Sequence, residues 1–230
     1  MRIGARLREL GKPSVEQLKR LWKPFVVIQL FGLAVILAYF FWPSFARWCD
    51  SIGAIKTRWG VFFAMITMPI SAGIVPEIVK TLTGVEKSFP AHRWRTIGFH
   101  LYIFAVSGVI SDGFYQLLAM WPGDSRDVAT VATKVALDQF VYTPFFGVPY
   151  LAFWYTLRAN RFSVSRTRAM IGRRWYINDV VPLLLPCWAF WIPMCSLMYL
   201  LPPALTYLFA VTANAAAATI LIAVAGRKRL

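Results

Sequence analysis

The apolar run FVVIQLFGLAVILAYFFWPSF, residues Phe25–Phe45, decides the fold class of this chain. Its length matches the roughly 20 residues that an α-helix needs to cross the hydrocarbon core of a bilayer. A membrane-spanning strand would alternate apolar and polar side chains, and the run shows no such alternation. Because lipid offers no partner for backbone N–H and C=O groups, we expect a transmembrane helix here.

The composition extends this prediction to the whole chain of 230 residues. Hydrophobic residues make up 58% of the chain and aromatic residues 16%, whereas charged residues make up only 15%. Soluble domains carry roughly 25% charged residues, and a soluble fold of this size could not bury so much apolar surface. We therefore predict an all-α, multi-pass transmembrane helical bundle.

About six apolar segments follow one another along the sequence. After the first come Trp59–Val79, Ile97–Met120 and Val131–Tyr155. The stretch Val180–Ala225 is long enough for two more spans, and we favour a fifth helix broken by prolines, a tight turn at LLPP and a sixth helix. The prolines of this stretch are Pro182, Pro186, Pro193, Pro202 and Pro203.

The net charge of +15 comes from Lys and Arg residues in short segments between the apolar runs. They form no single amphipathic surface, so nucleic acid is not an expected partner. With six spans, 20 of the 25 basic residues lie on the same side as both termini, which is then the cytoplasmic or an equivalent side. Five spans would weaken this asymmetry. The basic residues of the opposite side are Arg47, Lys56, Arg58, Arg126 and Lys134.

Polar residues of the third segment gather on one predicted helix face. Four of them, at offsets of 0, 7, 11 and 15, are His100, Ser107, Ser111 and Tyr115. At about 100° per residue these offsets form one narrow face, which Gly108 and Asp112 widen and Gln116 extends. Buried polar groups are costly in a bilayer, so this face should contact protein or water.

The fourth segment carries a second polar face at Lys134, Asp138 and Tyr142, with Gln139 beside it. Lys134 and Asp138 are four residues apart and can form an ion pair within the helix. The two polar faces could line a water-filled path, or they could join helices through hydrogen bonds. In the second segment, Glu77 and Lys80 are predicted to form an interfacial salt bridge.

Prolines follow the second polar face. Pro144 removes a backbone hydrogen bond, and Gly147 and Pro149 loosen the helix again. A helix weakened in this way could bend around a cavity, and we interpret these three residues as a gating segment.

Motifs of catalysis and metal binding are missing from the sequence. It contains no HExxH, GxSxG or phosphate-binding glycine loop, and its only histidines are His92 and His100. The three cysteines have no partners at metal-ligand spacing. We expect no enzyme activity, no catalytic residue, no metal and no cofactor. The cysteines are Cys49, Cys187 and Cys195.

The segment KVALDQFVYTPFFGVP resembles a signature of the family of the 22-kDa peroxisomal membrane protein and its mitochondrial inner-membrane relatives. In that family a Lys is followed by Asp-Gln and then by a Pro at the start of a membrane helix, as at Lys134, Asp138, Gln139 and Pro144. The segments RTIGF and SGVISDGFYQLL are also similar, although Gly-Pro is replaced by Ser-Gly. A family-like C-terminal block comprises Trp188, Trp191, Pro193, Tyr199 and Pro202.

The resemblance divides the chain into four parts. They are a basic N-terminal tail (1–24), an additional first transmembrane helix with its connection (25–58), a family-like bundle (59–225) and a basic C-terminal tail (226–230). The tail could be a transit segment, but Glu9 and Glu16 and the missing short apolar core favour a retained tail.

The resemblance implies a small multi-pass protein of organelle membranes. Some family members are described as weakly selective pores for small hydrophilic metabolites, and others are linked to stress. We expect a channel for small polar or anionic solutes between the third and fourth segments; the alternative is a non-transporting or stress-related membrane scaffold. The expected membrane is mitochondrial inner, peroxisomal or bacterial cytoplasmic. The expected partners are the bilayer and the solutes, and a homo-oligomer is left open.

Overall fold

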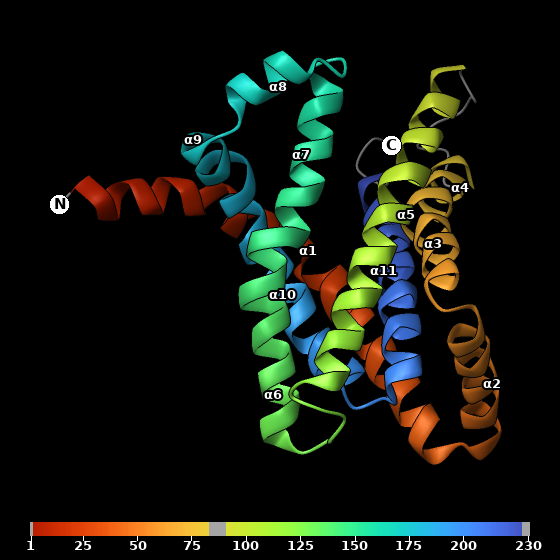
Figure 1. The fold of residues 1–230 in the computed structure, drawn as a ribbon. Coiled ribbons are helices and arrows are strands. Elements are labelled where there is room, and N and C mark those ends of the chain that lie inside the picture. Colours follow the sequence, from red (N-terminus) through yellow and green to blue (C-terminus); the bar gives the residue numbers. More distant parts are fainter. Residues whose placement is uncertain (1, 83–90, 227–230) are drawn as a thin grey trace. The chain divides into compact units, whose positions relative to one another are not determined.

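The computed structural model describes residues 2–82 and 91–226. The described residues form helices joined by short turns, with no strand among them, which confirms the predicted all-α class (Figure 1). The elements are α1 (Arg2–Phe41), α2 (Pro43–Trp59), α3 (Val61–Pro69), the π-helix η1 (Ile70–Ile74), α4 (Val75–Leu82), α5 (Ala91–Met120), α6 (Val128–Leu137), the π-helix η2 (Asp138–Gly147), α7 (Val148–Ala159), α8 (Val164–Met170), α9 (Arg173–Trp175), the π-helix η3 (Tyr176–Val180), α10 (Val181–Met198) and α11 (Pro203–Gly226).

Four helical stretches among the described residues are long and apolar enough to cross a membrane: Trp22–Phe41, Val61–Leu82, Arg93–Met120 and Tyr176–Met198. They fit an integral membrane protein and overlap the first, second, third and fifth predicted segments. The predicted fourth segment lies in the continuous helix α6–η2–α7 and the sixth in α11. The count of six therefore stays a prediction.

The boundaries of the first predicted segment and connection need correction. The first helix ends at Phe41, and α2 begins at Pro43, not after Phe45. Proline suits the first turn of a helix, because its missing N–H would have no helical partner there. The connection up to residue 58 is thus itself a helix, and the basic tail is helical from Arg2 onward. The C-terminal tail after Gly226 lies outside the described residues.

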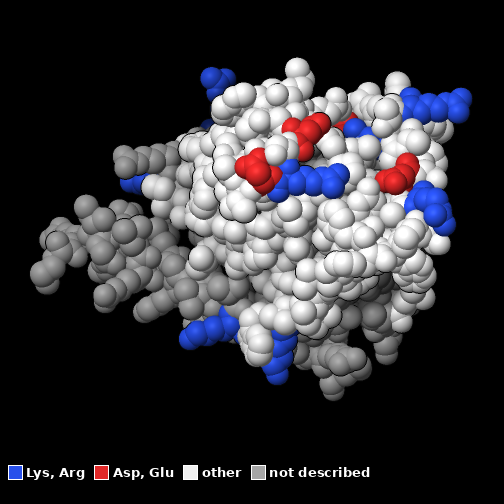
Figure 2. All heavy atoms as spheres, turned by 90° about the horizontal axis from the view of Figure 1, so that it is seen from below, with Lys and Arg blue, Asp and Glu red and all other residues white. Residues whose placement is uncertain are grey.

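The surface also has the character of a membrane protein. Phe41, Phe62 and Phe145 have exposed fractions of 81%, 64% and 65%. Figure 2 shows a face that is mostly uncharged, with a small number of acidic and basic side chains, some of them next to one another. In water, so many exposed large apolar side chains would cause association, whereas in a bilayer they contact lipid.

Each π-helix ends directly before a Val-Pro dipeptide. The valine N–H bonds to the carbonyl five residues earlier in all three cases. A helical proline has no N–H and its ring meets the carbonyl four residues before it, so a wider turn relieves the clash. The dipeptides are Val75-Pro76, Val148-Pro149 and Val181-Pro182.

Proline consequently widens these helices without ending them. The helix α10 also continues through Pro186 and Pro193, so the predicted break in the fifth helix is not confirmed. The predicted turn at LLPP is present: α10 ends at Met198 and α11 begins at Pro203.

The chain divides into two compact units. Unit 1 contains Met1–Trp22 and Val135–Pro193, and unit 2 contains Lys23–Lys134 and Met194–Leu230. In unit 2, α3 packs along α5, and α11 contacts α2, α4 and α5. The α3–α5 contact is close at Gly108, because a Cβ there would lie 2.6 Å from the Ala64 carbonyl oxygen. In unit 1, α7 contacts α8, η2 and η3.

Candidate functional site

A buried ion pair joins α2 to the predicted polar face of α5 in unit 2. Asp112 is 1% exposed, and its Oδ1 lies 2.7 Å from the Nζ of Lys56. Its Oδ2 accepts a hydrogen bond of 2.8 Å from the Nε2 of Gln116. Both carboxylate oxygens therefore have partners. A buried carboxylate needs such a cation, because an uncompensated charge in a low-dielectric interior is very costly.

A pocket of about 330 Å³ lies beside this ion pair. Its walls include Lys56, Asp112, Tyr115 and Gln116, with apolar surface from Met120. This volume is at the lower end of the range of about 300–1,000 Å³ that is typical of small-molecule sites. The C-terminal part of the predicted α5 face thus borders a pocket whose lining is mainly apolar and includes a few charged and polar side chains.

The N-terminal part of the same face has different surroundings. The ring of His100 packs against those of Phe99 and Phe104, with centroids 5.7 and 5.9 Å away. Ser107 is half-buried and Ser111 is buried. The structure therefore brings Asp112, Tyr115 and Gln116 to the pocket, whereas His100 lies in an aromatic contact.

Lys134 is a second buried cation of unit 2. It is 5% exposed, and its Nζ lies 3.8 Å from Oδ1 of Asp124, a residue of the turn before α6. The predicted partner Asp138 belongs to unit 1, together with Gln139 and Tyr142. The path predicted between the two polar faces stays a prediction.

Three tyrosines form a row between the two buried lysines of unit 2. The Nζ of Lys134 lies 5.9 Å from the ring centroid of Tyr199, and that of Lys56 lies 6.0 Å from the centroid of Tyr207. The ring of Tyr115 contacts both tyrosines, at 6.2 and 6.3 Å. Aromatic faces attract cations, and this attraction is strongest where water is excluded.

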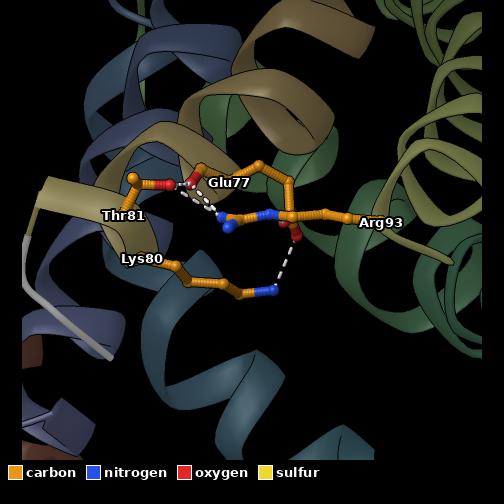
Figure 3. Close-up of polar contacts among 4 residues, drawn as sticks. All are labelled: Glu77, Lys80, Thr81 and Arg93. Atoms are coloured by element: carbon orange, nitrogen blue, oxygen red, sulfur yellow. Dashed lines mark hydrogen bonds and ion pairs between the residues drawn. The ribbon is translucent and has the colours of Figure 1, made fainter. Parts of the chain in front are cut away.

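Figure 3 shows a second charged cluster, between α4 and α5. Arg93 donates from Nε to Oε2 of Glu77 at 2.8 Å, and from Nη2 to the Glu77 carbonyl at 2.6 Å and to Oγ1 of Thr81 at 2.9 Å. The predicted pair of Glu77 and Lys80 is also present, at 2.6 Å.

Sequence reasoning missed Arg93 as a partner, because it treated the residue as a cation of a connection. The side chains of Arg93 and Glu77 are both buried, with exposed fractions of 2% and 4%. That of Lys80 is 28% exposed. The cluster is thus a buried helix–helix contact and not the simple interfacial pair expected. A carboxylate one helical turn from the end of an apolar segment could have signalled that a second cation was needed.

In unit 1, the π-helix η2 contains the buried residues Asp138 and Gln139. In a π-helix a carbonyl accepts from the N–H five residues later, and for Gln139 that residue is Pro144, which has no N–H. The indole Nε1 of Trp188 donates to the Gln139 carbonyl oxygen at 2.7 Å. The ring of Trp188 also packs on Phe140, with centroids 5.6 Å apart.

A second carbonyl of η2 loses its helical donor in the same way. The carbonyl of Pro144 would accept from residue 149, which is again a proline. The hydroxyl of Tyr176 donates to the Pro144 carbonyl oxygen at 2.8 Å. Gly147 lies near Tyr142, whose Cε1 is 3.5 Å from the position of an added Cβ. Two aromatic donors therefore supply the hydrogen bonds that the prolines withhold, and they hold the segment that the sequence predicted to be loose.

The other residues of the family-like block have structural contacts. Trp191 packs edge-to-face on Phe190, with centroids 4.9 Å apart, and Pro193 lies inside α10. Tyr199 lies in the turn after α10, and the carbonyl of Pro202 accepts two N–H groups, at 2.8 and 3.1 Å, at the start of α11.

The connection before α6 has a carboxylate with a shifted pKa. Hydrogen bonds from the Ser125 hydroxyl, the Thr130 backbone N–H and the Thr130 hydroxyl hold the pKa of Asp127 below its usual range. Asp127 thereby satisfies free N–H groups at the start of the helix. In residues 2–82 and 91–226, no group of three or more His, Cys, Asp and Glu side chains could hold a metal ion.

The chain matches no family model, no curated protein and no solved structure in comparisons with known proteins. The resemblance around Lys134 therefore stays a prediction.

Proposed function

We propose that the chain is a channel or pore-like membrane protein for small hydrophilic or anionic solutes. The observation that carries the proposal is the pocket beside the charged and polar side chains of Lys56, Asp112 and Gln116, within a bundle whose surface is largely apolar. Polar groups at membrane depth are costly, and solute pathways are a common reason for them.

Two buried lysines would provide the attraction for anions. Lys56 forms an ion pair with Asp112 and also lines the pocket, and an ammonium has three N–H donors that can face a solute there. Lys134 lies at the other end of the tyrosine row, and its 3.8 Å distance from Asp124 is longer than a direct hydrogen bond. Rings of fixed charge select ions in channels by the same attraction.

The proposal includes six spans with both termini on the cytoplasmic or an equivalent side. The membrane would be the mitochondrial inner, the peroxisomal or a bacterial cytoplasmic membrane, as the basic connections and the resemblance around Lys134 suggest. Asp138, Gln139 and Tyr142 belong to unit 1, and their part in a solute path stays a prediction from the sequence. No catalytic step and no cofactor belong to this proposal.

Solute flux into liposomes and conductance in planar bilayers test the channel. The wild type should conduct, and Lys56→Ala and Lys134→Ala should reduce anion flux several-fold. Arg58→Ala is the matched control, because it removes the same charge from an exposed position of α2 that does not line the pocket. A silent wild type, or equal flux in Lys56→Ala and Arg58→Ala, would contradict the proposal.

A non-transporting scaffold is the second candidate, and the saturation of the buried carboxylates favours it. Glu77 is paired with Arg93 and Lys80, and Asp112 with Lys56, as expected of charges that join helices. In that case Asp112→Asn should lower the unfolding temperature in detergent, while flux in the wild type stays at the baseline of empty liposomes.

A further inference from the structure

An apolar cavity of about 340 Å³ lies between α1, α2 and α11 in unit 2. Val35 and Tyr39 line it from α1, Trp48 and Ile52 from α2, and Leu208 from α11. The cavity shares no lining residue with the pocket at Asp112. It therefore has no part in the solute path proposed above.

The lining restricts what can occupy this cavity. Aliphatic and aromatic side chains form nearly all of its wall, so a polar occupant would lose its hydration without gaining hydrogen bonds. Helix α1 contributes the span Trp22–Phe41, whose composition suits the hydrocarbon region of a bilayer. At that depth the apolar group at highest concentration is a lipid acyl chain.

Polar groups gather near Tyr39, which is part of the lining. The hydroxyl of Tyr39 donates to Oδ1 of Asp50 at 3.1 Å. The ring of the next residue, Phe40, lies 5.4 Å from that of Tyr39, and the guanidinium of Arg126 lies 5.8 Å from the centroid of Phe40. Asp50 and Arg126 are both exposed. An accessible carboxylate and an accessible guanidinium thus accompany the apolar cavity.

These two charges match a zwitterionic headgroup. Guanidinium groups bind phosphate through paired hydrogen bonds, and a carboxylate accepts hydrogen bonds from a primary ammonium. A quaternary ammonium has no N–H to donate, so choline headgroups would gain less from the carboxylate. Exposed Trp48, which also lines the cavity, is a residue type that prefers the level of the headgroups.

We propose that this cavity binds one acyl chain of a phosphatidylethanolamine molecule, whose phosphate contacts Arg126 and whose ammonium contacts Asp50. The site would hold the corner between α1 and α2 against α11 by filling the space between them.

Native mass spectrometry of the full chain in detergent tests the acyl-chain site, with dioleoyl phosphatidylethanolamine as the probe. The wild type should retain one lipid molecule. Val35→Trp fills the cavity and should lose the lipid, whereas Val27→Trp should retain it. Val27 is the matched control, because it lies on the same helix, is 54% exposed and does not line the cavity. Equal lipid retention in the two variants would overturn the proposal.

A second variant that fills the cavity controls for the case in which Val35→Trp fails to fold. Thr212 lines the cavity from α11 and is exposed, so Thr212→Phe can enter the space without replacing a core residue. It should also lose the lipid while keeping the circular dichroism spectrum of the wild type. Full retention of the lipid by a folded Thr212→Phe protein would again overturn the acyl-chain site.

Headgroup variants test the assignment of the two charges. The wild type should bind dioleoyl phosphatidylethanolamine several-fold more tightly than the choline lipid with the same chains. Asp50→Asn should remove this difference by weakening only the ethanolamine lipid, whereas Arg126→Gln should weaken both. An unchanged preference in Asp50→Asn, or equal binding of the two lipids by the wild type, would overturn the headgroup assignment.

Discussion

The two units satisfy their buried polar groups in different ways. Unit 2 contains buried ion pairs that join two helices, namely Glu77 with Arg93 and Asp112 with Lys56. Unit 1 frees backbone carbonyls at prolines and supplies neutral donors, as in Trp188 to Gln139. In both cases the protein itself must supply the partner, because lipid cannot hydrogen-bond to a charged side chain or to a backbone carbonyl.

The two kinds of contact should differ in how much stability is lost when one partner is removed. Removing one member of a buried ion pair leaves a net charge without a partner, which costs several kcal/mol. Removing one neutral donor leaves an unsatisfied carbonyl, which costs less. Four predictions follow this order, from the largest expected effect to the smallest.

Arg93→Met should produce the largest loss of stability. It leaves the carboxylate of Glu77, 4% exposed, with only the more exposed Lys80 as a cationic partner. We expect a decrease of about 3–5 kcal/mol in the free energy of unfolding, measured by titration with a denaturing detergent in mixed micelles. Lys80→Met is the control and should cost much less. If both variants lost a similar free energy of unfolding, the burial of Arg93 would not make it a more important partner of Glu77 than Lys80.

Trp188→Phe should cost about 1–3 kcal/mol, because the Gln139 carbonyl loses its donor while the ring stays apolar. Trp191→Phe is the control at a tryptophan whose ring contact is with Phe190.

A double-mutant cycle sharpens this prediction. In the background of Pro144→Ala the backbone regains an N–H for the Gln139 carbonyl, so Trp188→Phe should cost less there than in the wild type. The coupling free energy from the four proteins measures the effect directly. No coupling would mean that the indole does not replace the hydrogen bond that proline withholds.

Tyr176→Phe and Tyr207→Phe compare the two units at the same substitution. The Pro144 carbonyl has only the Tyr176 hydroxyl in place of a helical donor, because residue 149 is a proline. The hydroxyl of Tyr207 donates at 3.2 Å to the Ala64 carbonyl, which lies inside α3 and has a regular helical donor as well. Tyr207→Phe should therefore cost about 0.5–1.5 kcal/mol and Tyr176→Phe more. If Tyr207→Phe lowered the free energy of unfolding more than Tyr176→Phe, the explanation that the Tyr176 hydroxyl replaces the missing N–H of Pro149 would be wrong.

The smallest effect is expected at Asp127, an exposed carboxylate at the start of α6 whose pKa is lowered by hydrogen bonds from Ser125 and Thr130. A lowered pKa in the folded state means that the charge stabilises the fold above the usual pKa of Asp and that this stabilisation is lost as the pH falls through the lowered value. Asp127→Asn should be slightly less stable than the wild type at neutral pH. The difference in unfolding temperature between the two proteins should shrink in acid. A difference that grew in acid would mean that the charge of Asp127 does not stabilise the fold.

The elements were predictable to different degrees. The helical class and the apolar segments followed from composition and run length, which are local properties. The corner at Trp42 was missed because the apolar run continues across it, although Pro43 marked a helix start. The surroundings of the prolines could not be predicted from the sequence, because the freed carbonyl takes its donor from a distant part of the chain: Trp188 is 49 residues from Gln139.

Composition and the length of the apolar runs are enough to predict a helical chain that is suited to a membrane and carries a few costly polar residues such as Asp112 and Asp138. The partners of buried charged groups depend on tertiary packing. Lys56 pairs with Asp112 and Arg93 with Glu77 across different helices. Helical periodicity relates residues of the same helix, whereas these contacts depend on how helices pack, and packing is set by all of their side chains together.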